Sequence, residues 1–428
     1  MARPTLSAAL ALGLLVGCAP VADAPGRSDA RLERADSIVA SWVAAGAVTG
    51  AVLLVSRNDE VVLQSAHGSA RAFEYDRGEY GASAAGESAA AALTRLAEPT
   101  PMTTSTVFDL ASVTKVMATT MAMMLLVDGG DIDIDEPVAS YLPDFRGAGK
   151  EGITPRHLLT HRSGLAQWLP VYYDATSPDE AYAFIRDRPL SWPVGEERHY
   201  SDLGFMLLGR LVDRVSGVSL DAFVRDELYS PMGLTSTGFR PLGQPRGLGT
   251  FAATSHGNPY EHRMVHDPDF GYRIEGDPDR WSGWREYTLA GEVNDGNAFH
   301  AWDGVAGHAG LFSTAGELRV LIQLLLNGGE HGGRRYVDGD VIDVFLTSTG
   351  EGQALGWQVP ANAPEGSFTH TGFTGTFVFG APSTGLAVVL LTNRQNGGVD
   401  AEGAYPDVAP LQRAVVAALT NEGGGPAR

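Results

Sequence analysis

Cysteine and lysine are nearly absent from this chain of 428 residues. The single cysteine is Cys18, so the chain can form no internal disulfide and its body has no thiol nucleophile. Lysine occurs only as Lys115 and Lys150, although Lys and Arg together number 31. Lysine can become neutral when it is desolvated, whereas arginine stays protonated, so a lysine in an arginine-rich chain indicates a position where a base is needed.

Positive charge is scarce as well. The formal net charge of -20 argues against a nucleic-acid partner, because a phosphate backbone needs a basic face. With 44% hydrophobic and 19% charged residues the composition is that of a globular protein, large enough for one big domain or two in close contact. The acidic balance favours solubility and identifies no substrate.

The first residues have the features of a secretion signal. Arg3 precedes an apolar stretch from Leu6 to Val16, which is too short for a stable membrane span. The stretch ends in Leu15-Val16-Gly17-Cys18, which resembles the lipobox of bacterial lipoproteins, where the cysteine is lipidated and becomes the mature N-terminus. This resemblance implies an exported protein of the cell envelope that contacts the membrane through its lipid anchor only. Ala19 in place of aspartate favours the outer membrane, facing the periplasm; a plain secretory signal is the alternative.

Composition divides the remainder of the chain. A polar tether is expected over residues 19–29, a single large domain over 30–421 and a flexible tail over 422–428. Residues 66–100 are rich in Ala, Gly, Ser and Glu and low in bulky apolar residues, which predicts a surface insertion in that domain.

Apolar periodicity predicts strands near both chain ends and helices between them. A hairpin is expected over 50–64, with its turn at Arg57–Glu60, and a second one over 374–393. Two such hairpins suggest one antiparallel sheet built from both chain ends, packed by the first and last helices, beside a mainly α-helical lobe, in an α+β fold. The helices expected from the 3.6-residue period are 30–45, 203–215, 315–326 and 408–419.

The stretch Phe108–Gly130 contains the motif Ser112-Val113-Thr114-Lys115 at the start of an apolar helical run. Residues i and i+3 share a helix face, so the Lys115 amine should meet the Ser112 hydroxyl. Asp109 suits an N-cap, Gly129-Gly130 should end the helix, and the helix N-terminus favours a developing oxyanion at Ser112. The wide apolar surface of the helix, which predicts burial, consists of Met117, Met121, Met124, Leu125 and Val127.

Two later motifs complete a pattern. Tyr200-Ser201-Asp202 stands just before the 203–215 helix, and His370-Thr371-Gly372 stands at the entrance to the last hairpin. With the S-x-x-K these resemble, in order and spacing, the three motifs of the β-lactamase and penicillin-binding-protein family: S-x-x-K, Y-x-N, and K-T-G or its H-T-G variant. The resemblance is closest to the class C β-lactamase-like branch, covers most of the chain, and extends to the stretches 153–165 and 303–314.

The resemblance implies a role for each motif residue. Ser112 attacks a carbonyl and carries an acyl-enzyme, Lys115 takes or holds its proton, and Tyr200 is the second proton-handling group. The backbone N–H groups of Ser112 and Phe373 form the oxyanion hole, and residues 370–373 bind substrate beside it. Such a site needs no metal and no cofactor.

Two departures from the family pattern bear on the substrate. Asp202 replaces the usual asparagine by a group that only accepts hydrogen bonds, and its expected partner is Lys115, whose pKa it would raise, or a substrate amide or ammonium. His370 replaces the lysine that attracts a β-lactam carboxylate and is charged only when protonated. We therefore expect a serine hydrolase acting on a carboxylic ester or a D-amino-acid peptide of the cell wall. A true β-lactamase and a penicillin-binding envelope protein that does not turn over remain alternatives.

Other side chains are weaker candidates for a functional role. His157 and His161 are spaced i,i+4 but lack the glutamate of a zinc motif, so a metal site is only a weak alternative. His300 and His308 flank a glycine-rich loop, where hydrogen bonding within the fold is the default role. The aromatic residues of the long loop region are expected to pack or to contact substrate; they are Trp281, Trp284, Tyr287 and Trp302. The oligomeric state cannot be inferred.

Overall fold

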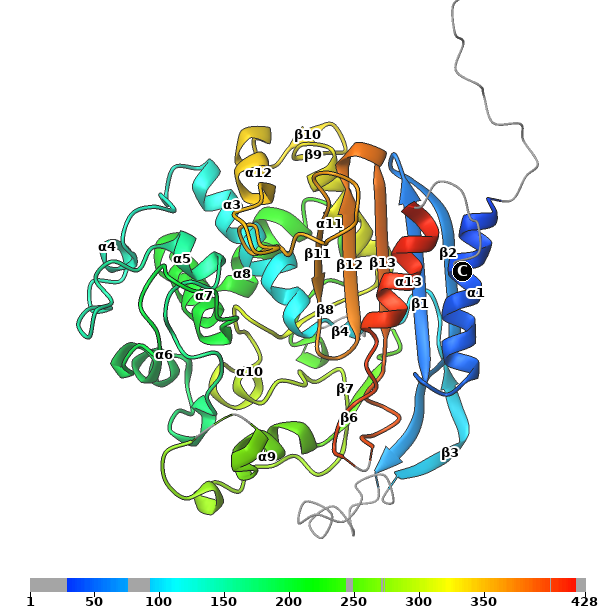
Figure 1. The fold of residues 1–428 in the computed structure, drawn as a ribbon, viewed down its shortest axis with the longest axis horizontal. Coiled ribbons are helices and arrows are strands. Elements are labelled where there is room, and N and C mark those ends of the chain that lie inside the picture. The colour runs from blue at the N-terminus through cyan, green and yellow to red at the C-terminus, as the bar shows by residue number, and fades with distance from the viewer. Residues whose placement is uncertain are drawn as a thin grey trace, which may run out of the picture.

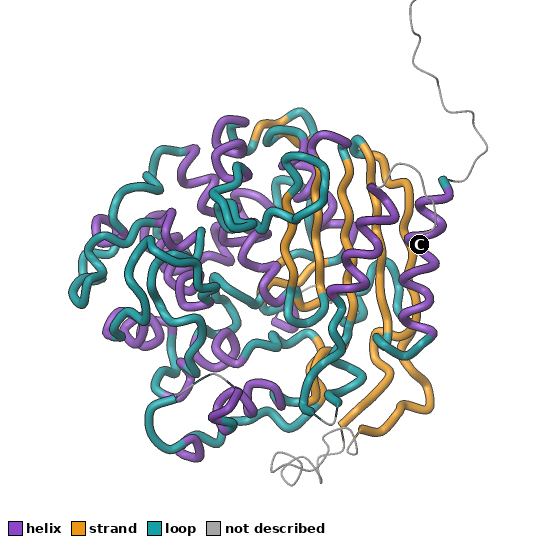
Figure 2. The backbone as a smooth tube through the Cα atoms, viewed as in Figure 1, coloured by secondary structure: helices purple, strands orange, loops and turns teal. Residues whose placement is uncertain are grey.

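The computed structural model describes residues 29–75, 93–243, 249–270, 272, 274–400 and 402–420. The signal with Cys18, nearly all of the tether, the tail 422–428 and the middle of the expected insertion, 76–92, therefore lie outside the described residues. One side of the described molecule is a six-stranded sheet with a helical layer on its outer face, and the other side is a mainly helical lobe (Figure 1, Figure 2).

Both chain ends build the large sheet, as the sequence predicts. Its strand order is β11-β12-β13-β1-β2-β3, and all neighbouring strands pair antiparallel. The two halves join where β1 pairs with β13, with Leu53 opposite Leu390. The strands are β1 (Gly50–Arg57), β2 (Glu60–Tyr75), β3 (Leu93–Pro101), β11 (Phe368–Thr371), β12 (Thr376–Ala381) and β13 (Leu386–Thr392).

The segment predicted as a surface insertion begins and ends as strand. β2 continues to Tyr75 and β3 begins at Leu93, and the two pair with Phe73 opposite Arg95. β3 is an edge strand whose side chains are mostly exposed or half-buried. An edge strand facing solvent needs few bulky apolar residues, so its composition resembled that of a loop.

Alternating side chains of the sheet supply two separate cores. On β1, Ala51, Leu53 and Val55 face the helices α1 (Ala30–Ala44) and α13 (Ala409–Thr420). Val52 and Leu54 face the opposite way, into the larger core that the sheet shares with α11 (Ala315–Leu326) and the lobe. This two-residue period explains why β1 is almost fully buried, because both of its faces are covered.

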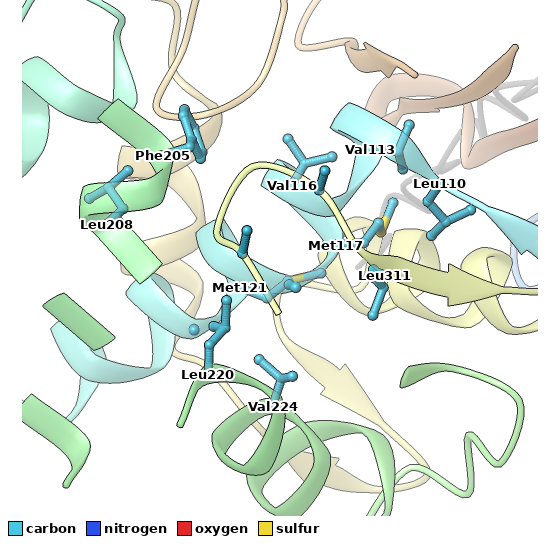
Figure 3. Close-up of a cluster of buried hydrophobic side chains, with 14 of the residues drawn as sticks. Leu110, Val113, Val116, Met117, Met121, Phe205, Leu208, Leu220, Val224 and Leu311 are labelled. Carbon is cyan, nitrogen blue, oxygen red and sulfur yellow. The ribbon is translucent and has the colours of Figure 1, made fainter. Parts of the chain in front are cut away.

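The helical lobe packs around the stretch that follows Ser112. There a turn of 3-10 helix, η2 (Ala111–Val113), is followed by a π-helix, η3 (Lys115–Thr120), and by α3 (Met121–Asp128). Met117, Met121 and Leu208 belong to the apolar cluster around this stretch (Figure 3). The span Ala111–Asp128 has the length and apolar character of a membrane helix, but 78% of it is buried inside the molecule. The other helices are α4 (Val138–Tyr141), α5 (Pro155–Leu159), α6 (Pro178–Asp187), α7 (Asp202–Ser216), α8 (Leu220–Val224), α9 (Pro259–His266), α10 (Gly296–Ala301) and α12 (Gly339–Leu346).

Short strands connect the lobe to the sheet. β4 (Phe108–Asp109) leads directly into η2 and pairs with β8 (Leu311–Ser313), which also pairs with β5 (Gly238–Phe239). The remaining strands form two small antiparallel pairs, β6 (Ala253–His256) with β7 (Thr288–Ala290) and β9 (Glu330–His331) with β10 (Arg334–Arg335).

Candidate active site

Asp109 shapes the turn that presents Ser112. Its carboxylate accepts hydrogen bonds from the backbone N–H groups of Ala111, at 2.8 Å, and Asn294, at 2.6 Å. Ala111 has φ +44°, a left-handed conformation that costs free energy for a residue with a side chain. Burial raises the pKa of Asp109 to about 6, against the opposing effect of the two N–H groups. The N-cap position of this turn is Leu110, so the prediction of Asp109 as the N-cap is wrong; Asp109 instead holds the strained backbone just before Ser112 through the Ala111 N–H.

The helix that carries Ser112 and Lys115 is less regular than the sequence predicts. We expected one continuous α-helix, whereas the structure has the 3-10, π and α segments η2, η3 and α3 in succession. Ser112 and Lys115 still meet, because the Lys115 Nζ donates to the Ser112 Oγ at 2.9 Å. Local departures from α-helix are common at functional sites, and no sequence period reports them. The α3 segment ends at Asp128, just before Gly129-Gly130, as expected.

The Lys115 ammonium lies in the interior and is paired. Its side chain has 0% exposure, and its Nζ is 2.7 Å from Asp202 Oδ1 and donates to the His308 carbonyl at 3.2 Å. Burial alone lowers the pKa of Lys115, but the charge of Asp202 and then Tyr200 outweigh it, so the pKa is raised. The contact predicted between Lys115 and Asp202 is present, and Lys115 rests as an ammonium rather than as a free base.

Tyr200 and Asp202 are positioned by the start of α7. The N-cap Ser201 accepts from the Gly204 N–H at 3.1 Å and donates to the Ala166 carbonyl at 2.7 Å, which fixes the residues on either side of it. Tyr200 lies beside Ser112 and Lys115: the Lys115 Nζ is 5.0 Å from the centroid of its ring, and both residues act on the pKa of its hydroxyl. Burial raises the pKa of Tyr200 and Lys115 lowers it, with a net rise that keeps the phenol protonated at neutral pH.

The His-Thr-Gly strand is hydrogen-bonded to the nucleophile turn. Thr374 Oγ1 donates to the Asp109 carbonyl at 2.8 Å, and Thr376 Oγ1 donates to the Leu110 carbonyl at 2.9 Å. A Cβ atom on Gly372 would lie 2.3 Å from the Leu110 carbonyl oxygen, so only glycine allows this approach. The sequence motif therefore places the end of β11 beside Ser112 through backbone contact.

Two backbone N–H groups are free at this junction. In the part of the chain that the structure describes, neither the Ser112 N–H nor the Phe373 N–H donates a hydrogen bond to another residue. Ser112 and Phe373 both line the same cavity. Unused donors beside a nucleophile are what a developing oxyanion requires, which supports the predicted role of this pair.

His370 carries no charge at this site. It is 1% exposed, and its Nδ1 lies 2.9 Å from the Thr371 carbonyl, so Nδ1 is the protonated nitrogen. Burial, followed by the nearby Lys115, lowers the pKa of His370 to about 3. The positive charge that a lysine would supply in a K-T-G motif is therefore missing at neutral pH.

Ser112 opens into a cavity of about 490 Å³. The predicted residues Tyr200, Asp202, Thr371, Gly372 and Phe373 line it with Ser112, whereas Lys115 and His370 lie behind the wall. Its other charged lining residues, which the sequence did not single out, are Glu261, Asp295, Arg394 and Asp407. Its aromatic and apolar walls include Trp168, Tyr260, Met264 and Tyr272.

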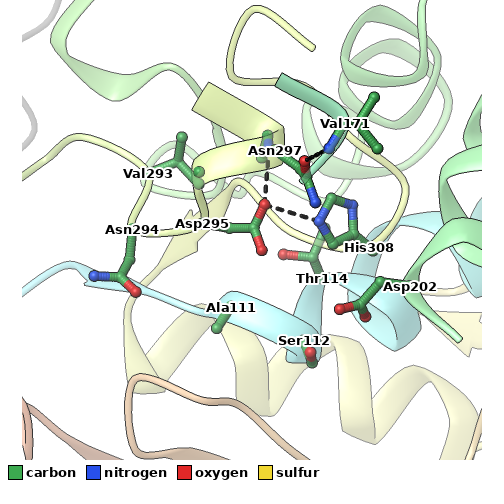
Figure 4. Close-up of polar contacts among 12 residues, drawn as sticks. Ala111, Ser112, Thr114, Val171, Asp202, Val293, Asn294, Asp295, Asn297 and His308 are labelled. Carbon is green, nitrogen blue, oxygen red and sulfur yellow. Dashed lines mark hydrogen bonds and ion pairs between the residues drawn. The ribbon is translucent and has the colours of Figure 1, made fainter. Parts of the chain in front are cut away.

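A pair of residues beside Ser112, the buried His308 and the cavity-lining Asp295, was missed from the sequence. His308 Nε2 lies 2.9 Å from Asp295 Oδ1 (Figure 4). The backbone carbonyl of His308 accepts a hydrogen bond from the Lys115 ammonium. Asp295 Oδ1 also accepts the Ala298 N–H at 2.7 Å as N-cap of α10. His308 belongs to the stretch 303–314, which resembles the family, but its pairing with Asp295 leaves no periodic signal in the sequence. His308 thus has the hydrogen-bonding role expected by default, directly beside the catalytic helix.

His161 contacts the Tyr200–Ser201 segment of the site. Its Nδ1 accepts the Ser201 N–H at 3.0 Å, and its ring packs against that of Tyr200 at a tilt of 35°, with centroids 4.4 Å apart. Burial and then Lys115 hold the pKa of His161 well below its usual value, so it is neutral. His157 instead caps α5 through Thr154. Among the described residues no group of three or more His, Cys, Asp or Glu side chains is placed to hold a metal ion.

The aromatic residues of the long loop region pack mainly on one another. Trp281 contacts Tyr172, Tyr173 and Trp284, with ring centroids 4.6 to 5.4 Å apart. None of Trp281, Trp284, Tyr287 and Trp302 lines the cavity beside Ser112; its aromatic wall is formed by other residues. Packing is therefore the role that the structure gives to this group.

Comparison with known proteins agrees with this geometry. The family model described as Beta-lactamase matches residues 35–412. The chain is 32% identical over 394 residues to the "N-acetylmuramyl-L-alanine amidase" of Bacillus subtilis (strain 168), with 86% of this chain and 82% of the relative covered. It is 32% identical over 416 residues to the "Putative D-alanyl-D-alanine carboxypeptidase" of Salmonella agona (strain SL483), with 91% and 87% covered. The fold matches the structure of a class C β-lactamase with a TM-score of 0.65 at 16% identity, over 93% of this chain and 98% of that one. The motifs, the fold and these relatives agree: the chain belongs to the β-lactamase family and is a serine hydrolase.

Proposed function

We propose that this protein hydrolyses an amide bond in a cell-wall peptide through a Ser112 acyl-enzyme. The observation that carries the proposal is the buried Lys115–Asp202 ion pair in contact with Ser112, at a site where His370 is neutral. The relatives named as an amidase and a carboxypeptidase act by name on this class of compound, and they cover most of the chain.

The proton of Ser112 needs a receiver during acylation. Lys115 rests protonated, so it accepts the Ser112 proton only as it passes its own proton to Asp202, 2.7 Å away. The Tyr200 hydroxyl, which lies beside Ser112 and Lys115, then delivers its proton to the leaving amine and takes up the one that Lys115 received from Ser112, so the proton of Ser112 ends on the leaving group; Asp202 returns its proton to Lys115. The Ser112 and Phe373 N–H groups stabilise the oxyanion while the new ester bond forms and the amide bond breaks.

Asp202 and the neutral His370 disfavour β-lactams. A β-lactam carries a carboxylate, and this site presents a carboxylate at the position of the family asparagine and no charge at the position of the family lysine. A peptide amide supplies an N–H donor, which Asp202 accepts. A carboxylic ester satisfies the same machinery and is the alternative substrate.

The test is to incubate the protein with purified muropeptides and follow the products by mass spectrometry. Release of D-alanine indicates a D,D-carboxypeptidase, and separation of the peptide from the sugar indicates a muramyl amidase; both must vanish in Ser112→Ala. p-Nitrophenyl acetate and nitrocefin measured in parallel rank ester and β-lactam turnover. One burst followed by silence on every substrate would favour a penicillin-binding module that is acylated without turnover.

We also propose that the protein is exported and lipid-anchored through Cys18, on the basis of the signal and lipobox pattern described above. Expression in a bacterial host fed a tagged fatty acid should label the wild-type protein and leave Cys18→Ser unlabelled. A labelled Cys18→Ser protein would overturn the assignment.

A further inference from the structure

The cavity that holds Ser112 is lined by more acidic than basic groups. Its charged lining residues are Asp202, Glu261, Asp295, Asp407 and Arg394. Asp202 pairs with Lys115 at 2.7 Å, and Asp407 opposes the lowering of the Arg394 pKa by burial. Within the ranges that the structure describes, neither Glu261 nor Asp295 has an arginine or lysine within 4.0 Å. The reaction described above uses neither of these two carboxyl groups.

One backbone amide brings Glu261 and Asp295 together. The Gly296 N–H donates to Glu261 Oε1 at 2.7 Å, and Gly296 directly follows Asp295 in the chain. Asp295 is fixed as well, because its Oδ1 accepts from the Ala298 N–H at 2.7 Å and lies 2.9 Å from His308 Nε2. In each carboxyl group the fold therefore engages one of the two oxygens.

The second oxygen of each carboxyl group lacks a donor. Glu261 is 9% exposed, and its Oε2 has no hydrogen-bond partner in the described part of the chain. No described residue donates to Asp295 Oδ2 either, and this oxygen points toward the turn that carries Ala111 and Ser112 (Figure 4). A buried carboxyl oxygen without a donor costs free energy, and a ligand that supplies N–H groups removes this cost.

The surroundings favour an organic cation over a metal ion. The described residues place no three His, Cys, Asp or Glu side chains where they could hold a metal. Aromatic rings line the same cavity: Trp168 meets Tyr272 edge to face at 5.5 Å between centroids, and the Tyr260 centroid lies 4.8 Å from that of Phe373. Carboxylates near aromatic rings suit an alkylammonium, which takes charge-assisted hydrogen bonds and cation–π contacts.

We propose that Glu261 and Asp295 bind a positively charged amine of the substrate, and so select acyl compounds that carry a free aliphatic amine. This inference rests on the proposed function in using the same cavity. Within that function it favours cell-wall peptides with a free amine, which either the N-terminus or the side chain of a diamino acid supplies.

The ionisation of Glu261 gives the site a measurable signature. Burial, and then the charge of Asp295, raises the pKa of Glu261 to about 8, although the Gly296 N–H, Arg285 and Tyr172 oppose the rise. An ammonium group stabilises the carboxylate form, so its binding at pH 7 should release about one proton from Glu261. Calorimetry in buffers of different ionisation enthalpy measures this release, which should be lost in Glu261→Gln.

Direct binding tests the site without any hydrolysis. 2-Phenylethylamine and 2-phenylethanol have similar shapes and differ in charge, because an alkylamine is still protonated at about pH 8.5. In titration calorimetry of the full-length protein at this pH, we expect the amine to bind about 10- to 100-fold more tightly, the range of a charge-assisted hydrogen bond. Glu261→Gln and Asp295→Asn should each lower this ratio about fivefold or more, because the amide keeps the shape and removes the charge.

The control variant is Asp407→Asn, which removes a carboxylate of the same cavity outside the Glu261–Asp295 pair and should leave the ratio unchanged. Either of the two test variants suffices if circular dichroism shows only one of them folded. A ratio near unity in the wild-type protein, or one that neither test variant changes, would overturn the proposal. An equal fall in all three variants would also overturn it, because the cavity would then attract cations only through its overall charge.

Peptides identify the source of the amine and separate this site from the proposed function. Three lysine-containing peptides ending in D-Ala-D-Ala are compared, with a free N-terminus, with a free lysine side chain, or with both amines acetylated. One free amine should raise kcat/KM about tenfold, and Glu261→Gln should abolish the gain; equal cleavage of all three would overturn the selection. If no peptide is cleaved while amine binding still depends on Glu261 and Asp295, the cell-wall assignment fails and the amine site stands. If all three are cleaved and amine binding ignores both residues, the peptide assignment stands and the amine site fails.

Discussion

The two lysines of this chain are both buried, but their surroundings differ in kind. Lys115, 0% exposed, faces the carboxylate of Asp202 at 2.7 Å and the hydroxyl of Ser112. Lys150, 1% exposed, donates to the backbone carbonyls of Arg186 and Arg188, both at 2.5 Å, at the C-terminal end of α6. The first lysine completes a reactive group and the second caps a helix.

Their pKa values shift in opposite directions for this reason. Burial lowers the pKa of both lysines, and in Lys115 the full charge of Asp202 more than offsets it. Lys150 has only neutral carbonyls in contact, with Asp187 and Glu151 farther off, so its pKa is lowered. A buried ionisable group is thus driven toward its charged form by a charged partner and toward its neutral form by a polar one.

The largest expected effect comes from removing each ammonium in turn. Lys115→Met should lower kcat/KM for p-nitrophenyl acetate by about 10³-fold, the usual contribution of a positioned proton-transfer group. Lys150→Met should leave kcat/KM within about twofold, because it touches no residue of the cavity. Circular dichroism must show both variants folded. Equal losses of kcat/KM in the two variants would contradict the assignment of a catalytic role to Lys115 and a structural role to Lys150.

Asp202→Asn changes only the partner of Lys115. Without the carboxylate, burial dominates and the Lys115 pKa falls, so the rise of kcat/KM with pH should move to lower pH. The variant also restores the family asparagine, so nitrocefin turnover should rise relative to ester turnover. We expect about a tenfold rise, because that is the effect of one additional hydrogen bond. Asp135→Asn, which disturbs an exposed pair with Arg156, is the control. An unchanged pH profile would mean that Asp202 does not set the charge of Lys115.

The role of Lys150 is measured by stability. Lys150→Met leaves two carbonyls at the end of α6 without their donor, and should lower the free energy of unfolding by about 1–3 kcal/mol, the cost of buried unsatisfied acceptors. Urea unfolding at pH 7 measures the change. Lys115→Met is measured beside it; this change removes a buried charge but leaves the Asp202 carboxylate without its partner. An unchanged free energy of unfolding for Lys150→Met would show that water replaces the lysine as donor.

The smallest effect extends the comparison to a carboxyl group. Asp213 accepts the Leu220 N–H at 2.7 Å, has Arg210 only at 4.0 Å, and burial raises its pKa to about 6 from an ordinary value of 3.8. Its protonated form stabilises the fold fully below about pH 3.8 and loses that contribution as the pH rises through about 6. Asp213→Asn should remove this decline, about 1 kcal/mol between pH 4 and 7 after solvent screening. Urea titrations at several pH values measure it, and parallel curves for variant and wild type would contradict the assignment.

Much of the site could be predicted from the sequence because its residues act through short, ordered motifs. Ser112 and Lys115 are one helical turn apart, and the Y-x-D and H-T-G motifs each begin or end an element. The contact between Lys115 and Asp202, which are far apart in the sequence, was expected only from the resemblance of their motifs to those of the family. The sheet from both chain ends followed from two apolar hairpins, because a two-residue period over a buried strand is a strong signal.

Contacts between distant segments were decided only by the tertiary structure. Asp295 and His308 come from opposite ends of a loop and form a hydrogen bond. Arg394, just after β13, donates a hydrogen bond to the Phe373 carbonyl. The π-helix after Ser112 has no local sequence pattern that would predict it. The neutrality of His370 likewise depends on its burial and on Lys115 nearby, which no motif records. The sequence by itself indicated the motif residues of the candidate site and the approximate position of the elements that carry them. The charge of each group was decided by the tertiary structure, because burial and the distance to a partner set a pKa, and both are properties of the packed molecule.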